Sequence, residues 1–142
     1  VDGAGNVNVS MVGRSIAGVG GFMDIAQGAR TVVFCTTLTY GGLRIALADG
    51  RVRIEQEGAA AKFVDRLQLV SFAGPDALAR GQRVLFVTER CVFRLTEHGL
   101  ELIEVAPGID VDRDVAAVVE FPFAVAADLG VMAVEHENGV PA

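Results

Sequence analysis

The apolar stretch at 31–36 constrains the fold of this chain more than any other feature. Thr31-Val32-Val33-Phe34-Cys35-Thr36 is a continuous run of strand length, which is typical of a β-strand covered on both faces. A glycine-rich turn at 18–21 precedes it, and residues 22–27 predict a helix that ends near Gly28. The alternating residues 6–12 predict a short strand before the turn. Strand, glycine turn, helix and buried strand in this order indicate an α/β fold.

The middle and the end of the chain are richer in β structure. Asp49-Gly50 favours the positive φ angles of a tight turn, so a hairpin is expected between 43–47 and 52–55. The other expected elements are strands at 63–72, 84–87, 91–95, 100–105 and 121–126, and helices at 75–80 and 110–119. The sequence shows no internal repeat and no linker, which indicates one domain over 1–142, with 127–142 left as a tail without an assigned element.

Composition excludes several classes of protein. The 142 residues carry a formal charge of -6, and the 12 basic residues are scattered, whereas a nucleic-acid-binding domain needs a clustered basic face. No apolar run reaches the roughly 18 residues that span a bilayer, and no signal peptide is visible. The first residue is Val1 instead of methionine, which suggests an excised or processed fragment.

Cysteine and histidine residues do not form a recognisable site. Cys35 and Cys91 both lie in apolar β-like runs, so we expect buried free thiols, which fit a reducing cytoplasm. No cysteine–histidine pair has metal-ligand spacing, and no metal site is expected. His98 lies in an apparent surface turn and is expected to be solvated. Glu135-His136-Glu137 is more typical of a solvated tail than of a metal cluster.

The turn Gly18-Val19-Gly20-Gly21 is the most informative local feature. Glycines let a ligand approach the backbone closely, and N–H groups at a helix N-terminus can donate to an oxyanion or a phosphate. A tight structural turn fits the same residues equally well. A dinucleotide fingerprint would require glycine where Met23 stands, and 13–18 has one residue too many for a hydrolase nucleophile elbow.

Four longer stretches together carry a family resemblance. They are residues 2–10, 18–26, 81–95 and 99–110. In order and spacing, over roughly residues 1–126, they resemble the C-terminal, β-subunit-like region of family I coenzyme A-transferases, especially the single-chain short-chain acyl-CoA:acetate/propionate type. The resemblance implies a partial domain of α/β class, with an open, mostly parallel sheet, flanking helices and added β-hairpins.

The resemblance also implies a mechanism and a set of site residues. In that family a glutamate carboxylate attacks an acyl-CoA thioester, and a glutamyl-CoA thioester forms that the acceptor carboxylate then attacks. Each step passes through a tetrahedral oxyanion, which backbone N–H groups stabilise. The family's pattern gives this role to the amide of Gly20 or Gly21, with Gly18, Val19 and Phe22 completing the substrate-binding segment. Coenzyme A is then a substrate, and no permanently bound cofactor is expected.

The chain departs from the family at the nucleophile. The family's glutamate belongs to a Glu-x-Gly motif well upstream of the glycine turn, but Asp2 is the only acid among the residues before Gly18. Glu137-Asn138-Gly139 has the motif's pattern in the wrong order. We therefore expect a nucleophile outside this chain, no activity of the chain alone, an N-terminal transferase region or subunit as partner, and a cytoplasmic homo-oligomer without a membrane or nucleic-acid partner.

Two other functions remain open at this level. A non-catalytic assembly domain could use the same fold, and a related thioester hydrolase or lyase subunit could keep the same turn. Four basic residues, Arg44, Arg51, Arg53 and Lys62, lie close together in the sequence. They suit either the phosphates of coenzyme A or the solvated face of a hairpin.

Overall fold

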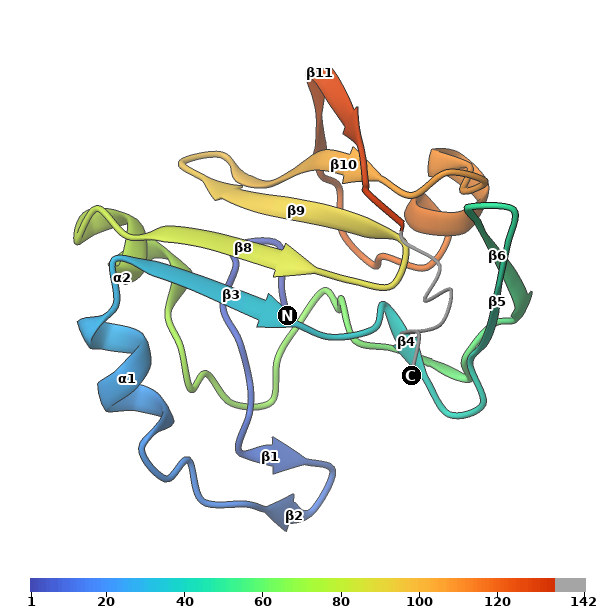
Figure 1. Ribbon diagram of the computed structural model, residues 1–142. Coiled ribbons are helices and arrows are strands. Elements are labelled where there is room, and N and C mark those ends of the chain that lie inside the picture. Colours follow the sequence, from blue (N-terminus) through green and yellow to red (C-terminus); the bar gives the residue numbers. More distant parts are fainter. Residues whose placement is uncertain (135–142) are drawn as a thin grey trace, which may run out of the picture.

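A mixed five-stranded sheet forms the centre of the computed structural model, which describes residues 1–134 (Figure 1). Its strands, in spatial order, are β11 (Ala124–Val131), β10 (Gly99–Val105), β9 (Cys91–Thr96), β8 (Arg83–Val87) and β3 (Thr31–Cys35). The β3–β8 and β10–β11 pairs are parallel, whereas β8, β9 and β10 form an antiparallel meander. The α/β class is confirmed, and the sheet is mixed because short turns connect its three middle strands.

Short elements surround this sheet. The two-stranded units pair β1 (Met11–Val12) with β2 (Ser15–Ile16), β4 (Thr39–Tyr40) with β7 (Ala60–Ala61), and β5 (Arg44–Ala48) with β6 (Arg51–Gln56). The helices are α1 (Phe22–Gly28), α2 (Gly74–Ala79) and the π-helical turn η1 (Val111–Ala116). The predicted hairpin turn is confirmed, with φ of 53° at Asp49 and 68° at Gly50. Figure 1 shows the β5–β6 hairpin standing away from the sheet.

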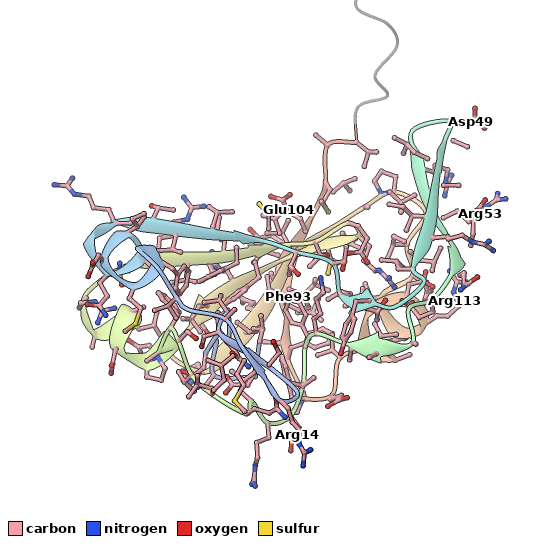
Figure 2. The ribbon with its side chains drawn as sticks, turned by 90° about the horizontal axis from the view of Figure 1, so that it is seen from below. Arg14, Asp49, Arg53, Phe93, Glu104 and Arg113 are labelled. Atoms are coloured by element: carbon pink, nitrogen blue, oxygen red, sulfur yellow. The ribbon has the colours of Figure 1, made fainter. Side chains whose placement is uncertain are left out.

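Phenylalanines fill the core beneath one face of the sheet. All eight of the chain are linked by ring-to-ring contacts. Phe34 of β3 stacks on Phe86 of β8 with ring centroids 5.2 Å apart, and Phe63 joins Phe86 to Phe93 of β9. Figure 2 shows Phe93 near the middle of the molecule. Because such pairs add to the free energy of burial, this network fixes which face of the sheet is the inner one.

Two expected strands in the first half are largely absent. Residues 63–72 form a loop, and only an isolated bridge joins Phe72 to Val7. Only the two ends of this loop, Phe63 and Phe72, enter the core, whereas Leu69 and Val70 between them are exposed, so the apolar residues do not share one buried face. The expected strand at 6–12 shrinks to that bridge and to β1.

The last two expected elements are also corrected. The helix expected at 110–119 is the shorter η1 turn, which Asp110 caps by accepting a hydrogen bond from the Arg113 N–H. The strand expected at 121–126 begins later, at Ala124, because Phe121 is buried in the core before the strand starts. Residues 127–131 belong to β11, and 135–142 lie outside the described residues.

The prediction for the cysteines is half correct. Cys91 is buried, and burial raises the pKa of its thiol to about 12. Cys35 is exposed, because β3 is an edge strand and the face that carries Cys35 and Val33 is uncovered. The expectation that β3 is covered on both faces is therefore wrong for this chain. No helix within residues 1–134 has the length and apolarity needed to cross a bilayer.

A buried guanidinium ties several separate segments to the end of the sheet. Arg90, in the β8–β9 turn, is 0% exposed. Its Nε donates to Glu89 Oε1 at 2.6 Å, and its Nη1 and Nη2 donate to the two carboxylate oxygens of Glu57 at 2.8 and 3.0 Å. Nη1 also donates to the Asp114 carbonyl oxygen at 2.8 Å, and Glu89 Oε2 accepts from the Leu38 N–H at 3.0 Å. The network joins the hairpin, the η1 turn and the segment after β3.

This network also shifts the acidity of its members. The hydrogen bond from Arg90 holds the pKa of Glu57 below its ordinary value, with further help from the Thr39 hydroxyl. Burial by itself would lower the pKa of Arg90, but Glu57 and Glu89 raise it overall. A carboxylate whose pKa is lowered in the folded state stabilises that state above its unfolded pKa, and this contribution is lost as the pH falls through the folded value.

Removing Arg90 is therefore expected to destabilise the fold strongly. Arg90→Ala leaves Glu89 in a buried site without its cation, at a cost of about 3–5 kcal/mol in the free energy of unfolding. The matched variant is Arg94→Ala, which removes a half-exposed partner of Glu101 and should cost about 0–1 kcal/mol. Urea unfolding of both variants makes the comparison, and equal losses would contradict the structural role of Arg90.

Acid should act through the same network. Stability is expected to decline as the pH falls below about 4.5, the ordinary pKa of Glu57, and Glu57→Gln should flatten part of this decline. An unchanged pH dependence in that variant would show that Glu57 is not responsible.

Candidate functional site

The glycine turn lies at the start of α1 and is open to solvent. Gly18, Gly20 and Gly21 are exposed, and Val19 is half-buried. Gly20 has φ of +52°, a left-handed conformation that favours glycine. A Cβ built on Gly18 or Gly20 would meet nothing within 4 Å. The turn is thus not packed against another part of the chain, and its glycines leave the backbone bare.

The hydrogen bonds of this turn leave amides available. The Val19 carbonyl accepts from the Phe22 N–H at 3.1 Å, and the Gly21 carbonyl accepts from the Ile25 N–H at 3.1 Å. Within residues 1–134, the N–H groups of Gly20 and Gly21 donate to no protein acceptor. The Val19 and Gly21 carbonyls are used inside the turn and the helix, whereas these two N–H groups have no acceptor among residues 1–134.

Phe22 connects the turn to the core. It is half-buried, and its ring lies 6.1 Å from that of Phe34 on β3. Phe34 in turn stacks on Phe86. The side chain assigned to substrate binding by resemblance therefore has a packing role, because it holds the beginning of α1 against the inner face of the sheet.

A pocket of about 540 Å³ lies at the carboxyl end of β3. Its wall is mostly apolar and is formed by Val1, Val7, Asn8, Val9, Met11, Phe34, Cys35, Thr36, Tyr40, Ala61, Lys62, Val64 and Leu67. Pockets of this size commonly hold small molecules, and carboxyl ends of parallel strands are frequent binding positions. The glycine turn does not line it, but Phe34 belongs to the pocket wall and contacts Phe22.

The four basic residues do not form one group. Arg44, Arg51 and Arg53 are exposed on the β5–β6 hairpin, and Figure 2 shows Arg53 pointing outward. Lys62 instead lines the pocket and donates from Nζ to Thr36 Oγ1 at 3.1 Å. Lys62 is separated from the arginines because it follows β7, which pairs with β4 and not with the hairpin.

The remaining candidates provide no second site. His98 is exposed in the β9–β10 turn, as expected. No group of three or more potential metal ligands occurs in the part of the chain that the structure describes. Glu135-His136-Glu137 and Glu137-Asn138-Gly139 lie outside the described residues.

Sequence reasoning missed both the pocket and the Arg90 network. The charged pair Glu89-Arg90 between two apolar strands was a usable signal, because charges so close to buried strands need partners. Its partners Glu57 and Asp114 come from distant segments, and no local pattern predicts them. The pocket combines residues from three parts of the chain, 1–11, 34–40 and 61–67, so only the fold reveals it.

Sequence comparison identifies relatives with a common activity. No protein-family model matches the chain. The acetate CoA-transferase YdiF of Escherichia coli O157:H7 is 43% identical over 132 residues, which are 93% of this chain and 25% of that protein. The caffeate CoA-transferase of Acetobacterium woodii is 38% identical over 133 residues, 90% of this chain and 25% of the relative. The chain thus spans about a quarter of the length of these relatives.

Comparison with solved structures agrees. A crystal structure of the E. coli O157:H7 acyl-CoA transferase YdiF, described as a thioester complex with CoA, superposes with a TM-score of 0.90 over 93% of this chain and 26% of that one. The decarboxylase AibA/AibB superposes with a TM-score of 0.67 at 19% identity, which shows a shared fold alone. By sequence and by structure, this chain is homologous to a quarter-length region of the coenzyme A-transferases.

Proposed function

We propose that this chain forms the oxyanion-binding part of a CoA-transferase that moves coenzyme A between a short-chain acyl-CoA and a carboxylic acid. The observation that carries the proposal is the exposed glycine turn, in which the Gly20 and Gly21 amides have no acceptor within the described chain. The 43% identity to a protein crystallised as a thioester complex with CoA supports the substrate class.

The chemistry assigned to the turn is charge stabilisation. A glutamate outside this chain attacks the thioester carbon, the C–S bond breaks, and the CoA thiolate leaves an acyl-glutamyl anhydride. The thiolate then attacks the glutamyl carbonyl carbon, which releases the first carboxylate and forms glutamyl-CoA. The acceptor carboxylate reverses these steps. Each addition places negative charge on a carbonyl oxygen, and N–H groups fixed at about 2.7–3.1 Å from that oxygen lower its energy.

The pocket at the carboxyl end of β3 suits the acyl or pantetheine part of the substrate. Its wall is mostly apolar, and the Lys62 ammonium at its edge can meet a carboxylate. Coenzyme A acts here as a substrate and not as a resident cofactor. We further propose an N-terminal transferase region or subunit as partner, a homo-oligomer as the assembled enzyme, and the cytoplasm as its compartment, which the free thiols of Cys35 and Cys91 fit.

Blocking the turn should reduce turnover without unfolding the protein. Gly21 is the sharper position, because its φ of -80° is open to any residue and a new Cβ would make only an ordinary contact, 3.8 Å from Ile25 Cδ1. Gly21→Val keeps the N–H but adds a branched side chain, which should hold the carbonyl oxygen of the substrate away from this donor. In the complete enzyme kcat should therefore fall by about 100-fold or more, the usual cost of losing an oxyanion donor. The thermal midpoint should stay within a few degrees.

The matched control for this variant is Gly28→Ala, at the other end of the same helix. A Cβ there meets nothing within 4 Å, so kcat should remain near the wild-type value. Wild-type turnover in Gly21→Val, and also in Gly20→Val, would remove the turn from the mechanism.

The isolated chain should transfer nothing. Incubated with acetyl-CoA and labelled acetate, the 142 residues should give no acyl exchange above the uncatalysed rate, because the nucleophile is absent. Robust exchange would mean that an acid within this chain is the nucleophile. In the complete enzyme, release of free CoA that does not depend on an acceptor carboxylate would instead favour a thioester hydrolase.

A further inference from the structure

One face of β3 is apolar and uncovered. The side chains of Val32 and Phe34 pack against the core, whereas those of Thr31, Val33 and Cys35 point away from it and are exposed, Val33 by 48%. The face continues onto β8, because Val33 pairs with Leu85 and Cys35 with Val87, both half-buried.

The outer edge of β3 is also unpaired. The Arg30 carbonyl accepts from the Arg83 N–H at 3.0 Å, and the Thr36 N–H donates to the Val87 carbonyl at 3.0 Å. Residues of a strand turn their N–H and C=O groups to alternate sides, so the groups of 32 and 34 also point toward β8. Those of Thr31, Val33 and Cys35 point to the free edge and have no partner among residues 1–134.

This edge lacks the features that usually protect a solvent-exposed edge strand. Proteins protect free edge strands with charges, prolines, glycines or bulges, and Thr31–Cys35 contains none of these residues. The opposite edge strand, β11, carries Asp128 and Gly130 in its sequence. A strand that is apolar on both faces is typical of the interior of a parallel sheet. The unpaired edge of β3 therefore favours pairing with a neighbouring strand, and its exposed apolar face favours packing against another element.

The length of the relatives shows how much additional polypeptide is available to supply a strand that pairs with β3. The relatives align with 93% of this chain, yet the matched region is only 25% of their length. About three quarters of such a polypeptide has no counterpart here and is available to cover β3. A second copy of the chain is the competing occupant, and a dependence of the protection on protein concentration distinguishes it.

We propose that β3 is an interior strand of the complete enzyme, and that a β-strand from the remaining part of the transferase polypeptide pairs with its free edge at Thr31, Val33 and Cys35. The same part covers the outer face that includes Leu85 and Val87. Because Cys35 and Thr36 line the pocket at the end of β3, the docked strand would end or begin beside that pocket. This inference rests on the proposed function only in taking the missing part to be the rest of a transferase.

Amide hydrogen exchange, which needs no turnover, tests the pairing. In the 142-residue chain the amides of Thr31, Val33 and Cys35 should exchange fast, and those of Val32 and Phe34 should be protected. In the complete polypeptide the three edge amides should slow by at least about 100-fold, as expected for paired strand interiors. The amides of β9, which is paired on both sides, are the internal control and should be protected in both proteins.

Substitutions test the covered face in the complete polypeptide. Val33→Lys places a charge in the proposed contact and should lower the thermal midpoint by more than about 5 °C, whereas Val125→Lys, at an exposed valine of β11, should lower it by less than about 1 °C. Val33→Thr keeps the β-branched shape and should give an intermediate fall if the lysine variant does not fold.

Two results would overturn the proposal. Fast exchange of Val33 in the complete polypeptide would show that its edge stays free. Protection that grows with the concentration of the isolated chain would show that a second copy occupies the edge. Because none of these readouts measures catalysis, a failed pairing and a failed oxyanion role are distinguishable.

Discussion

The arrangement of this molecule depends on a sheet whose inner face is packed with phenylalanines and whose outer face is exposed at β3. Phe34, Phe86 and Phe93 fix the inner face, and the linked phenylalanine rings connect it to α1 and to the long loop after β7. Burial of apolar area is the dominant favourable term in folding, and each aromatic side chain buries a large area. The outer face of β3 and β8 has no comparable cover among residues 1–134, so the same sheet that forms the core also exposes the surface through which the rest of an enzyme is proposed to attach.

The Arg90 network holds irregular segments of the chain at the end of this sheet. A buried guanidinium is costly unless it is paired and hydrogen-bonded, and here Glu57, Glu89 and the Asp114 carbonyl accept hydrogen bonds from all three of its nitrogens. Partners this specific favour one arrangement of the hairpin and the η1 turn. The network also reaches the segment that follows β3, because Glu89 accepts a hydrogen bond from the Leu38 N–H.

The sequence predicted the elements that depend on neighbouring residues alone, such as the hairpin turn and the strands of the meander. Asp49-Gly50 specifies its hairpin because few residues accept positive φ, and the apolar strands of the meander follow from their length and turns. The partial alternation in 63–72 suggested a strand, but only Phe63 and Phe72 are buried, and Leu69 and Val70 between them are exposed. The expectation that Cys35 is buried was wrong for a different reason. The apolar sequence context of this residue is typical of a covered strand, whereas among the described residues β3 is an edge strand and Cys35 is exposed.

The glycine turn is the point where family resemblance and geometry meet. Resemblance singled out Gly20 and Gly21, and the structure leaves their amides exposed and without an acceptor in the described chain. A structure of the complete enzyme trapped as its glutamyl-CoA thioester tests this account most directly. The account predicts that the N–H of Gly20 or Gly21 lies about 2.7–3.1 Å from the thioester carbonyl oxygen. Separations beyond about 4 Å for both amides, with another donor on that oxygen, would contradict it.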